Sequence, residues 1–410
     1  MRARAPRTWG CLGGLVVLGG VSLVACAGAS GDARPTSTID VLDGAVQDGA
    51  GSPGARDGGA PGLADAGGGE GAAPPPTGVE MARLVGRVDR RDPAGPRFAW
   101  PGSAVELRFR GTGLDVRLHD TAVDQLGVVI DGKPPVVVKT TATEDEYVIA
   151  RGLPDAVHTV TLTKRTETFF GTIQLLGVTA ISGADGGAPG TLLSPPAPRA
   201  HKMEVVGDSI TCGYGDEGVG PTCTFSPDTE SEASAYGAVA AARLGADHVA
   251  IAWSGKGMVR NYDGMADDVM PTLWLRTLAD DAASAWDFSW IPDVVVINLG
   301  TNDFAKGDPG QPFEAAYSAF LATLHAHYPA AYVVCATSPL LAAVDRDKQR
   351  AYIRSVVDAA NARGDAKVSL LDFDAQLPAD GYGCDYHPSG VTHVKMSDKL
   401  VAHVHALTGW

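Results

Sequence analysis

The sequence predicts an all-β sandwich followed by a three-layer α/β domain that is built on a five-stranded parallel sheet. Between about residues 80 and 183, apolar residues alternate with polar ones at the period of two that half-buried strands require. After residue 200, short apolar runs alternate with helical periods, which is typical of a parallel sheet covered on both faces. A chain of 410 residues is long enough for two domains that each bury a core.

The first 26 residues have the three parts of a secretory signal. Three arginines precede an uncharged apolar run at 11–25, and the run leads into the letters LVAC at 23–26. These letters resemble the lipobox of bacterial lipoproteins, in which the cysteine is lipidated. We therefore expect a lipoprotein signal peptide over 1–26, a lipid anchor at Cys26 and a place in the bacterial cell envelope. The alternatives are a plain signal peptide, which would release the protein, and an uncleaved signal anchor.

Residues 27–79 form a linker rich in Gly, Ala, Asp and Pro, a composition that cannot bury a core, so we expect a disordered tether. Its aspartates fit neither the EF-hand nor the glycine-rich calcium repeat, and no metal site is predicted there. The formal net charge of −15 argues against nucleic acid as a partner, and against a membrane except through the lipid anchor. It favours a neutral substrate.

The segment 80–183 is predicted to be a small β-sandwich of jelly-roll type. Alternation places one set of apolar residues on a single face of the strands at 104–110 and 158–164, namely Val105, Leu107, Phe109, Val160 and Leu162. Asp131-Gly132 lies between two apolar runs and predicts a hairpin turn. No segment in this part of the chain has the pattern of a long helix.

A Pro/Gly-rich joint at 184–199 leads to the α/β domain at 200–410. The predicted strands are 202–206, 248–252, 294–298, 331–336 and 367–371, and the predicted helices are 233–244, 313–327, 346–363 and about 393–407. In such sheets ligands bind beyond the carboxyl ends of the strands. Ser209 follows the first strand, Gly255 the second and Asn302 the third, while Asp385 and His387 follow the fifth beyond a short loop.

These residue types suit acyl transfer by a serine nucleophile. Each of them alone is an ordinary turn or loop residue, and only the ordered set is informative. A hydroxyl needs a base to take its proton, which predicts Ser209 as nucleophile and His387 as general base, with Asp385 orienting the imidazole. The Ser209 and Gly255 amides and the Asn302 side chain are predicted to form the oxyanion hole. No metal or organic cofactor is expected.

Four cysteines remain outside the predicted leader, namely Cys212, Cys223, Cys335 and Cys384. An even number in an exported protein suggests two disulfides, with three connectivities open. We expect Cys212–Cys223 and Cys335–Cys384.

Four sequence blocks resemble, in order, the signature blocks of the SGNH (GDSL-type) hydrolases: Gly207-Asp208-Ser209-Ile210, Gly255, Gly300-Thr301-Asn302-Asp303 and Asp385-Tyr386-His387-Pro388. The resemblance spans roughly residues 200–410. It implies a flavodoxin-like fold and the use of Ser, Gly, Asn and His in the roles given above. Most members have an aspartate three residues before the histidine, where this chain has Cys384.

The shorter Asp-x-His spacing and the preceding sandwich resemble carbohydrate esterase family two, whose members are acetyl esterases acting on plant polysaccharides. Stretches such as FAWPGSAVELRFRGTGLDVRL are similar to its N-terminal jelly roll. This resemblance implies removal of O-acetyl groups from sugar hydroxyls, at the primary 6-position, through an acetyl-serine intermediate. In that group the aspartate is not always present, and a backbone carbonyl can replace it as the partner of the histidine.

We expect a monomer, with Tyr214, Tyr262 and Tyr386 near the site and able to stack on a sugar ring. Two other functions stay open. One is a lipid acylhydrolase or lysophospholipase of the same fold, which would prefer long acyl chains. The other is a non-catalytic carbohydrate-binding lipoprotein, for which loss of one of the four signature residues would be expected.

Overall fold

The computed structural model describes residues 77–183 and 188–410. The predicted signal peptide over 1–26, the lipidation site Cys26 and nearly all of the predicted linker lie outside the described residues. Within the two described ranges, no helix combines the length and the apolar character needed to span a bilayer.

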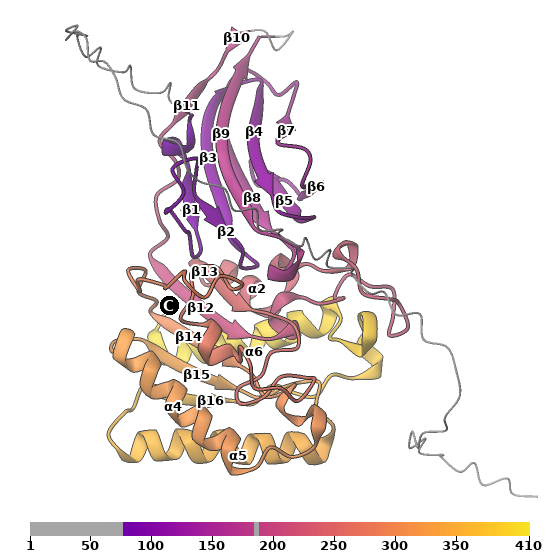
Figure 1. Cartoon of the computed structure of the whole chain (residues 1–410), viewed down its shortest axis with the longest axis vertical. Helices are drawn as coiled ribbons and strands as arrows, with labels where there is room; N and C mark the ends of the chain where they lie inside the picture. The colour runs from indigo at the N-terminus through magenta and orange to yellow at the C-terminus, as the bar shows by residue number, and fades with distance from the viewer. Residues whose placement is uncertain (1–76, 184–187) are drawn as a thin grey trace, which may run out of the picture. The chain divides into compact units, whose positions relative to one another are not determined.

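The N-terminal lobe is a sandwich of two antiparallel sheets (Figure 1). One sheet contains β1 (Arg83–Val85), β3 (Ala104–Gly111), β8 (Ala156–Lys164), β5 (Gln125–Ile130) and β6 (Val136–Lys139), with β11 (Thr191–Leu193) also paired to β3. The other contains β10 (Ala188–Pro189), β9 (Ile173–Ser182), β4 (Gly113–Asp120) and β7 (Glu146–Ala150), with β2 (Arg97–Phe98) also paired to β9. The five predicted inward residues all belong to the core between these sheets.

The predicted hairpin lies between β5 and β6. Asp131 and Gly132 have φ angles of 51° and 70°, and the Lys133 amide donates to the Ile130 carbonyl at 3.0 Å, which closes the turn. Asp131 also accepts from the Thr159 amide at 2.9 Å. The turn is therefore attached to the neighbouring strand β8.

The C-terminal lobe is built on a parallel sheet of five strands in the order β13-β12-β14-β15-β16, as Figure 1 shows. Their bounds are β12 (His201–Gly207), β13 (Ala246–Ala252), β14 (Val294–Asn298), β15 (Tyr332–Ala336) and β16 (Val368–Leu371). This is a doubly wound order: the second strand, β13, is added on one side of β12, and the later strands are added on the other side. A ligand crevice is therefore expected where β12 and β14 end side by side.

Helices cover both faces of this sheet. They are α2 (Tyr236–Arg243) and α6 (Gly390–Thr408) on one face, and α4 (Gln311–His327) and α5 (Ala343–Ala362) on the other. Alternation along the strands separates the two cores: Val205 and Val296 pack with α2 and α6, whereas Val206 and Ile297 pack with α4 and α5. The three-layer α/β prediction is confirmed.

Short helical segments complete the fold. The single α-turns are α1 (Ser209–Cys212) and α3 (Met270–Leu273). The 3-10 turns are η1 (Val79–Met81), η2 (Thr168–Phe170), η3 (Pro227–Thr229), η4 (Glu232–Ser234), η5 (Asp303–Lys306), η6 (Pro378–Asp380) and η7 (Cys384–Tyr386). Ser209 begins α1, Asn302 is the N-cap of η5 and His387 is the C-cap of η7, whereas Gly255 lies in the loop after β13.

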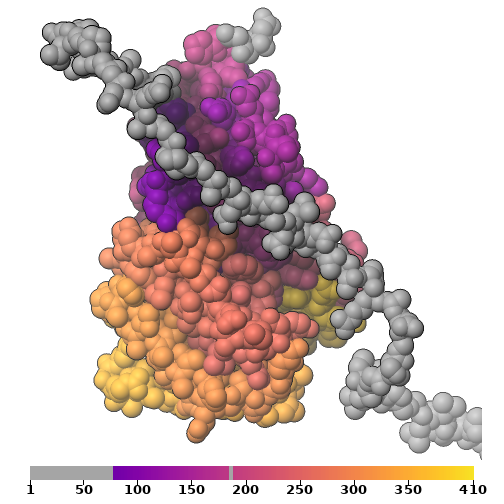
Figure 2. All heavy atoms as spheres, viewed as in Figure 1, coloured from indigo at the N-terminus to yellow at the C-terminus, as the bar shows by residue number. Residues whose placement is uncertain are grey.

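Buried polar contacts join the two lobes, whose purple and orange atoms adjoin in Figure 2. Arg83 of β1 pairs with Asp247 of the edge strand β13 at 2.8 Å. The Arg87 guanidinium pairs with Glu204 of β12 at 3.2 Å, and both side chains are 1% exposed. Both lobes fall within one compact unit of the chain, 72–410.

Candidate active site

Ser209 lies at the first position of α1, directly after β12, and is 5% exposed. Asp208 caps this turn, because its carboxylate accepts from the Ile210 amide at 3.1 Å. A side chain at Gly207 would place its Cβ 1.9 Å from the Thr211 hydroxyl oxygen, so only glycine allows this strand-to-helix turn. Burial raises the pKa of Asp208 to about 7, and its contacts are those of a residue that holds the turn.

His387 is brought to Ser209 from the loop between η7 and α6. Its Nε2 lies 2.9 Å from the Ser209 hydroxyl oxygen, within hydrogen-bond distance. Burial lowers the pKa of His387 to about 4, so the imidazole is neutral near pH 7. A neutral imidazole is the form that can accept the serine proton.

The structure corrects the predicted role of Asp385. The Asp385 carboxylate accepts from the Tyr214 hydroxyl at 2.9 Å, while the buried Nδ1 of His387 has no side-chain partner. The backbone groups of Cys384 and Asp385 raise the His387 pKa, against the larger effect of burial. Asp385 adopts a left-handed φ of 52°, and the residue between it and the histidine also has a positive φ. This backbone turns the carboxylate toward Tyr214 and leaves carbonyl oxygens near the imidazole.

The three predicted tyrosines have different positions. Tyr214 packs on His387 with ring centres 4.1 Å apart and stacks on Phe225 at 3.7 Å. Tyr262 lines the cleft and is 63% exposed. Tyr386 is exposed, is not among the residues that line the cleft, and has its ring centre 5.7 Å from that of Tyr382. Its predicted stacking on a sugar ring stays a prediction.

The three predicted oxyanion donors line one cleft with His387. The cleft has a volume of about 610 Å³, and its walls include Ser209, Gly255, Asn302 and His387. Gly255 has a φ of 79°, a left-handed conformation that favours glycine. The Asn302 amide nitrogen donates to the Lys256 carbonyl at 2.8 Å, which joins the loop after β14 to the loop after β13.

Asp303 fixes the loop that follows Gly255. Its buried carboxylate accepts from the amides of Met258 at 2.9 Å, Val259 at 2.7 Å and Arg260 at 3.1 Å. Burial raises the pKa of this carboxyl, and the three amide donors act in the opposite direction. The last residue of the Gly-Thr-Asn-Asp block is therefore the anchor of the oxyanion loop, a role that sequence reasoning did not assign.

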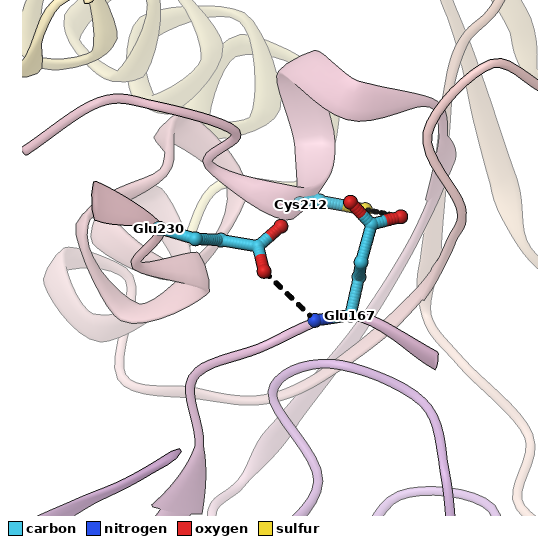
Figure 3. Close-up of side chains that lie close together, drawn as sticks. All are labelled: Glu167, Cys212 and Glu230. Carbon is cyan, nitrogen blue, oxygen red and sulfur yellow. Dashed lines mark hydrogen bonds between the residues drawn. The ribbon is translucent and has the colours of Figure 1, made fainter. Parts of the chain in front are cut away.

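A second anchor comes from the sandwich and was also missed. Glu167, 0% exposed, accepts from the Ser254 amide at 2.6 Å and from the Ser254 hydroxyl at 2.5 Å. Figure 3 shows its carboxylate beside Cys212 of the nucleophile turn, with Glu230 close by. The available signal was the charged run KRTET at 164–168, which ends an otherwise alternating strand.

Both predicted disulfide pairings are wrong. Within the described part of the chain one disulfide forms, Cys223–Cys384, between the loop after the nucleophile turn and the loop that carries His387. Cys212 and Cys335 are buried free thiols. Cys212 faces Glu167 from within α1, and Cys335 lies in β15 of the parallel sheet.

Comparison with known proteins agrees with this architecture. The family described as Carbohydrate esterase 2 N-terminal matches residues 84–196, and the GDSL-like Lipase/Acylhydrolase family matches residues 205–394. The Cellulase/esterase CelE of Acetivibrio thermocellus is 38% identical over 79% of this chain, which spans 39% of CelE's length. An acetylxylan esterase / glucomannan deacetylase of Cellvibrio japonicus is 25% identical, with 80% of this chain and 89% of that protein covered.

The fold also matches solved structures. A family two carbohydrate esterase from Clostridium thermocellum, in complex with cellohexaose, is 37% identical and superposes with a TM-score of 0.76. The match covers 80% of this chain and 99% of that one, and therefore includes both lobes. The chain belongs to the family two carbohydrate esterases.

Proposed function

We propose that this chain is a serine esterase that removes O-acetyl groups from the hydroxyls of a plant polysaccharide or oligosaccharide, at the primary 6-position. The observation that carries the proposal is the 2.9 Å contact between the Ser209 hydroxyl and His387 Nε2, in a cleft that also contains the oxyanion donors. The relatives named acetylxylan esterase / glucomannan deacetylase support the substrate class.

The geometry suits two acyl transfers. Ser209 attacks the acetyl carbonyl while His387 Nε2 takes its proton, and the negative oxygen lies against the Ser209 and Gly255 amides and Asn302. Collapse of this intermediate breaks the bond to the sugar oxygen, which receives the proton from His387. Water then attacks the acetyl-serine with His387 again as base, which releases acetate and restores Ser209.

A comparison of substrates tests the proposal. Acetylated glucomannan and acetylxylan should release acetate, 4-nitrophenyl acetate should be cleaved, and long-chain 4-nitrophenyl esters should be poor substrates. Ser209→Ala is the control, and activity that survives this change would contradict the mechanism. The cleft wall includes Leu340 and Leu341, whose apolar side chains suit contact with an acyl chain. A preference for long-chain esters would therefore favour the lipid acylhydrolase instead.

We also propose that Cys26 carries the lipid anchor that holds the enzyme in the cell envelope. The support is the signal sequence alone, with its lipobox-like end. Labelling of expressing cells with a radioactive fatty acid should mark the protein, and Cys26→Ala should abolish the label. Equal labelling of both proteins would contradict the anchor.

A further inference from the structure

The backbone of Glu167 is fixed within the sandwich. The buried Lys164 ammonium donates to the carbonyls of Thr166 at 2.9 Å and Glu167 at 3.0 Å, and pairs with Asp124 at 2.6 Å. These contacts leave the Lys164 charge neutralised by Asp124 and its remaining donors on the backbone. Glu167 is thus presented to the other lobe from a held segment of chain.

The Glu167 carboxylate accepts hydrogen bonds from both the amide and the hydroxyl of Ser254. Ser254 gives its amide to one oxygen at 2.6 Å and its hydroxyl to the other at 2.5 Å. Ser254 immediately precedes Gly255, so its backbone orientation decides where the Gly255 amide points. Two charge-assisted hydrogen bonds to the same residue fix both its backbone and its side-chain rotamer.

Glu230 lies next to Glu167 and changes the charge balance. One of its carboxylate oxygens accepts from the Glu167 amide at 3.0 Å, and the other oxygen has no hydrogen-bond partner among the described residues. Among the described residues, neither glutamate forms an ion pair with a basic side chain. Two buried carboxyls this close share a proton. Burial raises the pKa of both carboxyls, and that of Glu230 lies well above its ordinary value. The two Ser254 hydrogen bonds act against burial at Glu167, which favours the negative charge on Glu167.

Glu167, Glu230 and Cys212 are also a set of potential metal ligands, with ligand atoms within 4.8 Å of one another (Figure 3). However, both oxygens of Glu167 already accept hydrogen bonds from Ser254. A cation coordinated there would compete with both bonds. The contacts thus favour an anchoring role for the carboxylate over a metal site.

We propose that Glu167 of the sandwich is a positioning residue for the reaction, because it orients Ser254 and through it the oxyanion-stabilising amide of Gly255. The inference rests on the proposed serine esterase function. It makes the N-terminal lobe part of the catalytic apparatus, although none of its residues touches the reacting atoms.

The test is steady-state hydrolysis of 4-nitrophenyl acetate by the full chain. Because a misplaced oxyanion donor costs up to about 10²-fold in rate, Glu167→Ala should lower kcat by about that factor with KM nearly unchanged. Glu167→Gln should recover most of the activity, since its amide can accept from the Ser254 N–H and donate to the hydroxyl. Glu106→Ala is the matched control, because Glu106 also lies at the lobe junction but pairs only with Arg83.

Ser254→Ala removes the hydroxyl hydrogen bond to Glu167 and keeps the one from the Ser254 amide. This milder variant still tests the contact if Glu167→Ala fails to fold. It should lower kcat less than Glu167→Ala, and the double variant should resemble Glu167→Ala alone because the two residues act through one contact. The inference fails if folded Glu167→Ala matches Glu106→Ala, if Glu167→Ala and Glu167→Gln are equally impaired, or if only KM changes. It also fails if the wild type holds one equivalent of metal that Glu167→Ala lacks. Wild-type activity that does not need Ser209 would instead overturn the proposed function.

Discussion

The two sides of the catalytic cleft are held in different ways. On the oxyanion side, two buried carboxylates bind four amides of one loop: Glu167 binds that of Ser254, and Asp303 binds those of the three consecutive residues 258–260. On the base side, His387 has a buried Nδ1 without a side-chain partner, and its loop is tied down by the Cys223–Cys384 disulfide. Hydrogen bonds to buried carboxylates thus hold the oxyanion side, while a disulfide and the backbone conformation hold the side that carries His387.

The largest effect should follow from breaking the oxyanion side directly. Asn302→Ala removes a donor that lines the cleft and the hydrogen bond to the Lys256 carbonyl. Loss of one such donor typically costs about 10²–10³ in kcat, with little change in KM. Steady-state kinetics on 4-nitrophenyl acetate would measure it. A variant with wild-type kcat would remove Asn302 from the oxyanion hole.

Breaking the covalent link tests the base side. Cys223→Ser with Cys384→Ser should lower the free energy of unfolding by about 2–4 kcal/mol, because the disulfide closes a long loop. It should also lower kcat, since the His387 loop loses its attachment to the loop after the nucleophile. Denaturant unfolding and kinetics would measure both effects.

Cys335→Ala serves as the control for that experiment, because Cys335 is a buried free thiol in β15. Its kcat should be unchanged even where its stability falls. A double serine variant with the stability and activity of the wild type would show that the disulfide does not order the site.

The protonation of His387 gives a test by pH. Burial lowers its pKa to about 4, so the imidazole stays neutral as the pH falls below its ordinary titration range. The acid limb of kcat/KM should therefore have its midpoint below pH 6.5, the ordinary value for histidine. Samples returned to pH 7 must regain activity, which excludes unfolding. A midpoint at or above 6.5 would mean that the free enzyme stabilises the imidazolium.

The smallest effect is expected for Asp385→Asn. Because Asp385 contacts Tyr214 and not the His387 ring, the change should lower kcat by less than about 10-fold, against about 10⁴-fold for a triad aspartate. Tyr214→Phe removes the same hydrogen bond and should have a similar effect. A loss approaching that of a triad aspartate would restore Asp385 as the residue that orients the base.

The sequence was sufficient for the parallel sheet, for the inward faces of β3 and β8, and for Ser209, Gly255, Asn302 and His387 as residues of one cleft. Periodicity and the ends of parallel strands are local signals. Ser209 and His387 are 178 residues apart, yet strand topology alone predicts that they meet. The disulfide and Asp385 were not predictable in this way. They depend on the path of loops 213–225 and 383–387, and in the second loop the consecutive residues Asp385 and Tyr386 both have left-handed φ angles. The charged run at 164–168 is a local signal for Glu167, but the contact of Glu167 with Ser254 depends on how the two lobes dock.

The Arg87–Glu204 pair at the junction of the lobes has a consequence for how such genes recombine. Each charge is buried, and among residues 77–183 and 188–410 its ion-pair partner comes from the other lobe. Removal of one partner from such a pair typically costs about 3–5 kcal/mol. A gene fusion that included the α/β lobe without the sandwich would leave Glu204 buried without its ion-pair partner Arg87. It would also leave Trp274 without the Arg87 guanidinium that packs over its ring. The two lobes are therefore expected to be inherited and shuffled among larger polypeptides as a single cassette.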